Sequence, residues 1–250
     1  MKKLLFAILL FSFSFCQAQN VFITSGKIEF EKKVNMHKEI ESFSSGDNSW
    51  IERLKKNLPQ YNITYFDLYF DSTKSLYKPG KEVVTTGMKM PEWFSSPAAD
   101  NIIYDNLQTG ETVSQKNVFE NTFLIKDSLR KIEWKMTSEL REIAGFQCHR
   151  AETIIMDSIY IIAFYTDQII PAGGPESLHG LPGMILGMVI PRMHATWFAT
   201  NVQVTGIKTD IIQPPQKGKK VDNKELYNQL QGAMKDWGES GQRNIWRVML

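Results

Sequence analysis

Cysteine is scarce in this chain of 250 residues, which contains only Cys16 and Cys148. So few thiols exclude a disulfide framework, and no Cys-x-x-Cys pair is present for a structural zinc site. Beyond the N-terminus no apolar run approaches the about 20 residues that a transmembrane helix needs. Charge is nearly balanced, with 29 basic and 27 acidic residues, and no basic stripe with interleaved aromatics occurs. The sequence therefore predicts neither a nucleic-acid partner nor a membrane-spanning segment in the mature protein.

The first 18 residues have the pattern of a signal peptide. A pair of lysines at positions 2 and 3 precedes an apolar segment, residues 4–15, that is too short to span a bilayer. We expect cleavage after Ala18, which leaves a single mature domain of residues 19–250 with 27 basic and 27 acidic residues. This pattern predicts an exported protein that is periplasmic or associated with the outer membrane.

Each cysteine leaves two interpretations open. Lipid attachment at Cys16 competes with simple cleavage, although Phe15 stands where a lipobox needs a small residue. After cleavage Cys148 is either a reactive thiol, a metal ligand or an intermolecular bridge, or it is a buried, inert side chain. We favour the buried thiol, because apolar Phe146 shares its strand face.

Alternating apolar and polar residues predict many short strands. Ile28, Phe30, Val34 and Met36 alternate with polar residues, and only Lys32 breaks the apolar face. Similar patterns indicate further strands at 65–70, 75–78, 146–151, 154–165, 184–190 and 196–204, with a hairpin at 109–110 and a turn at 144–145. Residues 122–136 are expected to form one strand, or two strands with a turn at 127–128. About ten strands predict an all-β or β-rich α+β fold, antiparallel, with a strongly curved sheet or half-barrel and a C-terminal helix packed on it.

Helices and one irregular segment complete the prediction. A short helix is expected from an N-cap at Asp47 to a stop at Pro59. The C-terminal helix, about 222–237, begins with Asp222 and Glu225 in a capping-box pattern and is expected to pack through Leu226, Leu230, Ala233, Met234 and Trp237. The tail after Gly238 and Gly241 is apolar enough to pack on the body or a partner. A loop that contains Met88, Met90, Trp93 and Phe94 is expected to cover an apolar surface.

A glycine–proline loop stands before the strand at 184–190. Gly173-Gly174-Pro175 and Gly180-Leu181-Pro182-Gly183 combine free and fixed φ angles, which predicts a rigid turn. A phosphate cradle is not expected, because Pro182 lacks the N–H that such a loop would use. We therefore assign a structural role to Gly174, Pro175, Gly180, Leu181, Pro182 and Gly183.

The loop resembles the signature of the GLPGLI family, with Met184 where the name has leucine. Residues 143–148, 163–167 and 174–175 are similar to other parts of that family's pattern, and residues 26–30 less specifically so. The resemblance implies an exported bacterial envelope protein of unassigned function, of a type often found beside outer-membrane transporters. It implies no catalytic residues.

Metal chemistry has one weak sequence signal. Met188, Met193 and His194 cluster together, close to Met184, and thioether with imidazole suits Cu(I). Methionine also fills buried strands, and we favour a core role for the cluster over a copper site. No cofactor is expected.

Two functional hypotheses remain. The first is a non-catalytic envelope binding or accessory protein, which would hold a hydrophobic peptide, a lipid segment or a transporter surface against the curved sheet. The second is a secreted hydrolase that uses loop residues near Ser177, His179 and His194, with Asp157 and Asp167 as further acids. Close packing of those three side chains around a polar pocket would favour the hydrolase, whereas an apolar groove with scattered histidines would favour the binding protein.

Overall fold

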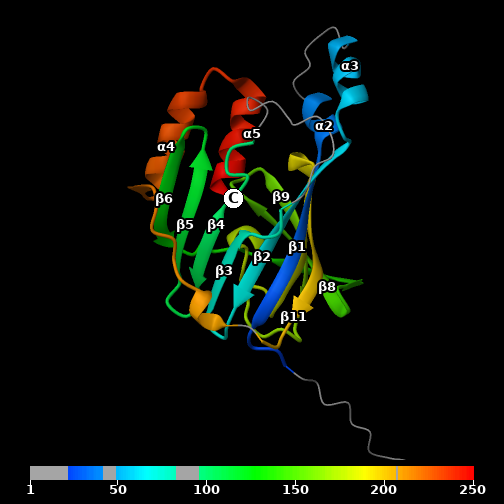
Figure 1. The fold of residues 1–250 in the computed structure, drawn as a ribbon, viewed down its shortest axis with the longest axis vertical. Coiled ribbons are helices and arrows are strands. Elements are labelled where there is room, and N and C mark those ends of the chain that lie inside the picture. The colour runs from blue at the N-terminus through cyan, green and yellow to red at the C-terminus, as the bar shows by residue number, and fades with distance from the viewer. Residues whose placement is uncertain (1–21, 42–48, 83–95, 207) are drawn as a thin grey trace, which may run out of the picture.

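A computed structural model describes residues 22–41, 49–82, 96–206 and 208–250. Its main feature is one open sheet of twelve strands in the order β12-β6-β5-β4-β3-β2-β1-β11-β10-β9-β8-β7 (Figure 1). All neighbouring strands are antiparallel except β12 and β6, which are parallel. The strands are β1 (Gly26–Asn35), β2 (Tyr61–Phe70), β3 (Lys74–Pro79), β4 (Ile102–Asn106), β5 (Glu111–Val118), β6 (Asn121–Ser128), β7 (Lys135–Ile143), β8 (Phe146–Ile155), β9 (Ile159–Thr166), β10 (Met184–Ile190), β11 (Ala195–Gln203) and β12 (Lys219–Val221).

The predicted fold class is confirmed, and the alternation that predicted it has a simple origin. Successive strand side chains point to opposite faces, so one set enters the core and the other meets solvent. Phe30 on β1 and Leu68 on β2 are fully buried in the main core, whereas the intervening charged and tyrosine side chains lie on the outer face. Figure 1 shows the sheet curving so that β9 lies behind β4 and β1.

Tight turns divide the strands. The expected turn at Ala144–Gly145 joins β7 to β8, and both residues have the positive φ that favours a two-residue hairpin. The predicted single strand over 154–165 is wrong, because Met156 and Asp157 also take positive φ and separate β8 from β9. The predicted turn at 127–128 is likewise wrong, since both residues belong to the end of β6.

The single predicted C-terminal helix is in fact two helices, α4 (Asn223–Met234) and α5 (Gly238–Met249). The predicted N-cap is confirmed, because the Asp222 carboxylate accepts a hydrogen bond from the Glu225 N–H at 2.7 Å. Gly238 has a φ of 55° and begins α5, where the sequence suggested the end of a helix. Ala233, within α4, is exposed. Trp237 lies beyond the end of α4 at Met234, is 50% exposed, and contacts only the ring of Phe119 among the described aromatic pairs.

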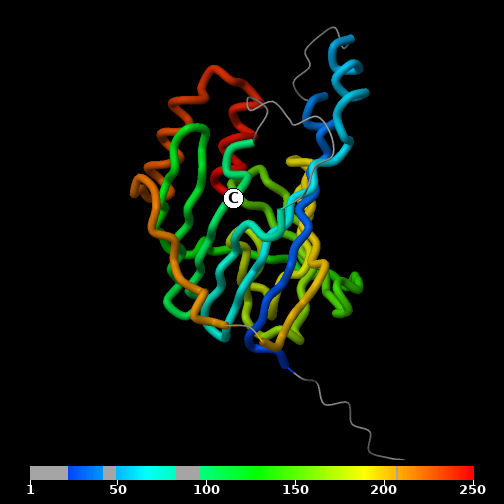
Figure 2. The backbone as a smooth tube through the Cα atoms, in the orientation of Figure 1, coloured from blue at the N-terminus to red at the C-terminus, as the bar shows by residue number. Residues whose placement is uncertain are grey.

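The tail packs on the body as predicted. Trp246 and Leu250 belong to the main core, while Ile245, Val248 and Met249 join α4 and β6 in a second apolar cluster. In Figure 1, α4 lies beside β6, and α5 lies at the upper opening of the curved sheet. Figure 2 shows how the chain gets there, since after β11 it returns along the outside of the sheet to reach β12 and α4. Ile212 anchors this return by packing with Leu76 and Tyr104.

Two short helices, α2 (Met36–Glu41) and α3 (Ser49–Asn57), pack together through Ile40, Ile51 and Leu58. The expected N-cap at Asp47, the methionine–tryptophan loop at 88–94 and the signal segment 1–18 with Cys16 lie outside the described residues. Among the helices that the structure describes, none is both long enough and apolar enough to cross a membrane.

Candidate functional site

A buried glutamate lies at the centre of the glycine–proline loop. Glu176 is in the short 3-10 turn η2 (Pro175–Ser177) between β9 and β10, and its side chain is 1% exposed. Glu176 and Ser177 have φ of 53° and 61°, in the left-handed region that costs a non-glycine residue about 1 kcal/mol or more. Such strain persists only where the surrounding structure holds the residue in place, and here it directs a carboxylate into the core.

Lys32 pairs with this carboxylate. Its Nζ lies 3.1 Å from Oε1 of Glu176 and 4.8 Å from the centre of the Trp197 ring, while the Asn101 amide donates to Oε2 at 2.9 Å. The lysine that interrupts the apolar face of β1 is therefore the counter-ion of a buried acid. Buried charges need such partners, because desolvation alone would force them to neutralise.

Two further cations approach the last turn of α5. Nζ of Lys116, on β5, donates to the Val248 carbonyl at 2.8 Å, and Nη2 of Arg130 donates to the Met249 carbonyl at 2.6 Å. Cations near a helix C-terminus satisfy carbonyls that lack a partner within the helix and complement the helix dipole. These bonds fix the end of α5 against β5 and the segment after β6.

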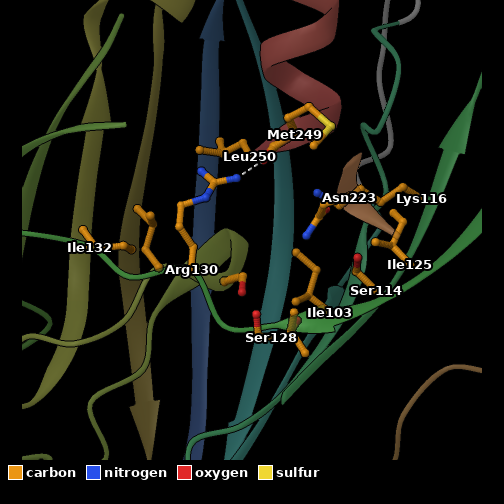
Figure 3. Close-up of a pocket in the computed structure, with 13 residues that line it drawn as sticks. Ile103, Ser114, Lys116, Ile125, Ser128, Arg130, Ile132, Asn223, Met249 and Leu250 are labelled. Carbon is orange, nitrogen blue, oxygen red and sulfur yellow. Dashed lines mark hydrogen bonds between the residues drawn. The ribbon is translucent and has the colours of Figure 1, made fainter. Parts of the chain in front are cut away.

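The two cations border a small cavity of about 40 Å³ (Figure 3). Hydroxyl groups of Thr112, Ser114, Ser128 and Ser177 and the Asn223 side chain provide its polar lining, and Ile103, Ile125, Ile132, Leu178, Met249 and Leu250 its apolar lining. A volume of this size holds two or three water molecules.

Burial shifts several acid–base groups around the cavity. It lowers the pKa of Lys116 to about 8, an effect that the Arg130 charge reinforces and Glu176 opposes. Burial also raises the pKa of Asp105, although the Thr112 and Ser177 hydroxyls favour its charged form. For Glu176, burial acts to raise the pKa, but the charges of Lys32 and Lys116 and the bond from Asn101 outweigh it and lower the pKa. The centre therefore contains an ionised Glu176 and a lysine that titrates near neutral pH.

The predicted loop residues lie where a structural role needs them. Gly174, Pro175 and Leu181 are buried, and backbone bonds join the loop to itself and to β10, including Gly180 N–H to the Ala172 carbonyl at 3.0 Å and Ile185 N–H to the Gly173 carbonyl at 2.9 Å. Gly183 has a φ of 132°, and an added Cβ would lie 2.1 Å from the Thr166 carbonyl oxygen. Pro182 is exposed beside it.

The three residues of the hydrolase hypothesis do not form a relay in the described part of the chain. The Ser177 hydroxyl donates to Asp105 at 3.1 Å, and Nδ1 of His179 lies 3.1 Å from the Ser177 main-chain carbonyl, not from its hydroxyl. His194 has a φ of 48° at the end of a different turn, and its carbonyl accepts from Asn35. Beside the cavity, the structure does bring the Ser177 hydroxyl next to the buried carboxyl group of Asp105.

The copper candidates lie mainly in the core. Met184 and Met188 are fully buried on β10 and Met193 is 5% exposed, whereas His194 is half-buried. Within the described ranges, no three histidine, cysteine, aspartate or glutamate side chains are grouped as metal ligands.

Cys148 is fully buried and is expected to be unreactive. Burial raises its pKa to about 12, and its Sγ–H points to the Phe146 carbonyl at 3.6 Å.

At pH 8 we expect labelling of Cys148 by a disulfide reagent to be roughly a thousandfold slower in the native protein than in urea, because the thiolate is the reactive form. The Cys148→Ser variant is the control, because any labelling that it shows comes from Cys16. Complete native labelling of Cys148 within minutes would contradict this.

A second surface, the tyrosine face, lies on the outer side of β2. Tyr61, Tyr65 and Tyr69 follow at intervals of four residues, so they share one face about 13 Å apart. Tyr61 is 43% exposed and the other two are half-buried. Carboxylates flank the rings, with Tyr65 donating to Glu31 at 3.3 Å and Tyr69 to Asp67 at 3.4 Å.

Lysines cover parts of the tyrosine face. The Nζ of Lys81 lies 4.2 Å from the centre of the Tyr65 ring, and that of Lys33 lies 5.6 Å from the centre of the Tyr61 ring. Both contacts are cation–π interactions at an exposed surface, where each contributes about 0.5–1 kcal/mol. A ligand can displace such side chains at little cost.

The sequence does not identify Glu176, Lys116 or Arg130 as site residues. The available signal is Lys32, which breaks an apolar strand face, because an inward lysine requires a buried acid. Nothing local identifies that acid, which lies 144 positions away.

One comparison with known proteins identifies a family. A family model described as "N-glycanase peptide, N-terminal domain" matches residues 72–228, more than half of the chain. No curated protein matches. The resemblance to the GLPGLI family is not confirmed by these matches and stays a prediction.

Two solved structures of PNGF-II share the fold. One, in space group P21, has a TM-score of 0.52 at 16% identity over 82% of this chain, and the other, in space group C2, has 0.50 at 17% over 89%. This chain spans 33% of the length of each. At such identity the likeness establishes the fold alone. From the family match, the chain belongs to the N-glycanase peptide, N-terminal domain family.

Proposed function

We propose that this is an exported, non-catalytic binding protein for glycan-bearing ligands, such as N-linked glycopeptides. The family description names the N-terminal domain of an N-glycanase, which supports a role with N-glycans. Because the chain matches only a third of PNGF-II, the activity of that longer protein is not carried over. A partner in the envelope, including an outer-membrane transporter, stays part of this proposal.

The tyrosine face is the observation that carries the proposal. A sugar ring presents C–H groups on its faces and hydroxyl groups around its rim. Aromatic rings contact the former, and carboxylates accept hydrogen bonds from the latter. Tyr61 and Tyr65, with Glu31 and Asp67 beside them, offer both on an open strand surface long enough for several sugar units.

The buried centre supports binding over catalysis. The Glu176 charge is balanced by Lys32 and Asn101, and the cavity is too small to admit a sugar ring. Hydrolysis remains the second candidate function, favoured by the shifted pKa values of Lys116 and Asp105 next to the Ser177 hydroxyl.

Calorimetric titration with a defined N-glycopeptide tests the binding role. We expect Tyr65→Ala to weaken binding roughly tenfold, because the contact between the aromatic ring and the sugar face is lost. Tyr160→Ala is the matched control, since Tyr160 is a half-buried tyrosine on β9, outside the tyrosine face, and bonded to Arg150. Equal affinities of the two variants, or no binding by the wild type, would refute the proposal.

A further inference from the structure

We propose that the cavity between β5, β6 and the end of α5 is a binding site for one anionic group, a carboxylate, sulfate or phosphate. Arg130, Lys116 and Ser114 would hold it. The inference goes beyond the glycan-binding proposal, because it depends on the cavity and not on the tyrosine face.

Arg130 has unused donors. A guanidinium carries five N–H groups, and within the described residues Arg130 forms only the bond from Nη2 to the Met249 carbonyl. No carboxylate of the described chain lies within ion-pair distance of it. In Figure 3 its guanidinium lies beside Leu250, on the far side of the cavity from Lys116.

Lys116 is in a similar position. It is 5% exposed, its one hydrogen bond in the described structure goes to the neutral Val248 carbonyl, and no described carboxylate lies within ion-pair distance of its Nζ. A buried ammonium without a contacting anion is costly, and an anion in the cavity would offset that cost. Burial lowers the pKa of Lys116 to about 8, and a bound anion would raise it again.

Ser114 supplies a neutral donor. It is 7% exposed and lines the cavity, and its hydroxyl forms no hydrogen bond with the part of the chain that the structure describes. The other hydroxyls are engaged: Ser177 donates to Asp105, Thr112 lies 3.4 Å from the Tyr104 carbonyl, and Ser128 lies 3.4 Å from Asp127.

The local charge favours an anion. Of the buried acids nearby, Glu176 is paired with Lys32, and Asp105 accepts a hydrogen bond from the Ser177 hydroxyl. Among the described residues, neither acid forms an ion pair with Lys116 or Arg130. The cavity of about 40 Å³ suits a single carboxylate or oxyanion group, and exposed Ser128 places its mouth at the surface.

Calorimetry with sodium sulfate, at an ionic strength kept constant with sodium chloride, tests the site. We expect Arg130→Gln to weaken sulfate binding tenfold or more, because charge-assisted bonds are lost. Lys131→Gln is the matched control: it removes one positive charge from the next residue, whose side chain is 89% exposed, and should change affinity less than twofold. Ser114→Ala, which breaks no bond of the described structure, should weaken binding about threefold or more and covers the case in which Arg130→Gln fails to fold.

The same calorimetric titration is repeated with sialyllactose, with neutral lactose and with inorganic phosphate. Tighter binding of sialyllactose than of lactose, weakened in Ser114→Ala but unchanged in Tyr65→Ala, indicates an acidic sugar as the source of the anion. Binding of sulfate or phosphate alone, with the same dependence on Ser114, indicates a free anion. No sulfate binding by the wild type, or equal binding by wild type, Arg130→Gln and Ser114→Ala, would overturn the proposal. Either result would leave the glycan-binding proposal standing, because that proposal depends on the tyrosine face.

Discussion

Gly183→Ala is expected to destabilise the protein by about 4 kcal/mol or more, enough to prevent folding of a marginally stable domain. The new Cβ would lie 2.1 Å from the Thr166 carbonyl oxygen and 2.8 Å from its carbon, and φ at this position is 132°. Backbone on both sides is fixed by the pairing of β9 with β10, so neither can move away without breaking that pairing.

Gly180→Ala is the matched control in the same loop. Gly180 also has a positive φ, 90°, but the nearest atom to an added Cβ is Nε1 of Trp134 at 3.9 Å. We expect a loss of only about 1–2 kcal/mol, from backbone strain alone. Urea unfolding followed by tryptophan fluorescence measures both variants. Similar losses for the two would show that the close approach of Gly183 to Thr166 does not limit the stability of the loop.

Glu176→Ala is expected to cost about 3–5 kcal/mol, because it leaves Lys32 buried without a counter-ion. It also leaves the Asn101 amide without its acceptor. Glu41→Ala is the control: Glu41 pairs with Lys38 and Lys55 but is 40% exposed, and a surface pair contributes about 0–1 kcal/mol. Thermal unfolding at pH 7 compares them. Equal losses would mean that the buried pair is no more important than a surface one.

The same residue predicts a pH dependence. The pKa of Glu176 is lower in the folded protein than its ordinary value of 4.5. Its contribution to stability is therefore complete above about pH 4.5 and is lost as the pH falls from there through the folded pKa. Glu176→Gln should lack this part of the acid-induced loss. An identical acid profile for wild type and Glu176→Gln would refute the ionised state of the buried centre.

The sequence predicted the fold class because its evidence is local. Alternation along β1 and β2 indicates which side chains are buried, and the pair Asp222–Glu225 indicates where α4 begins. The end of that helix is not predicted correctly, because Gly238 is typical of a helix end yet begins α5. The apolar residues of α5 are buried only by contact with the folded sheet. The methionine–tryptophan loop and Asp47 lie outside the described residues.

The candidate site could be predicted only in part. Gly174 and Gly183 were recognised as structural, since glycine beside proline restricts the backbone locally. Glu176, between them, has no local signature, and its partner Lys32 lies on a distant strand. Lys116 and Arg130 meet α5 more than 110 positions later in the chain, and no periodic pattern encodes such contacts.

Nuclear magnetic resonance of the isotope-labelled protein, titrated with a defined N-glycopeptide, tests glycan binding most directly. Saturable shift changes at β2, centred on Tyr61 and Tyr65, with the glycopeptide recovered intact, are the predicted result. No shift change at β2, or release of the glycan with changes centred on Ser177 and Lys116, would contradict the account and favour the hydrolase.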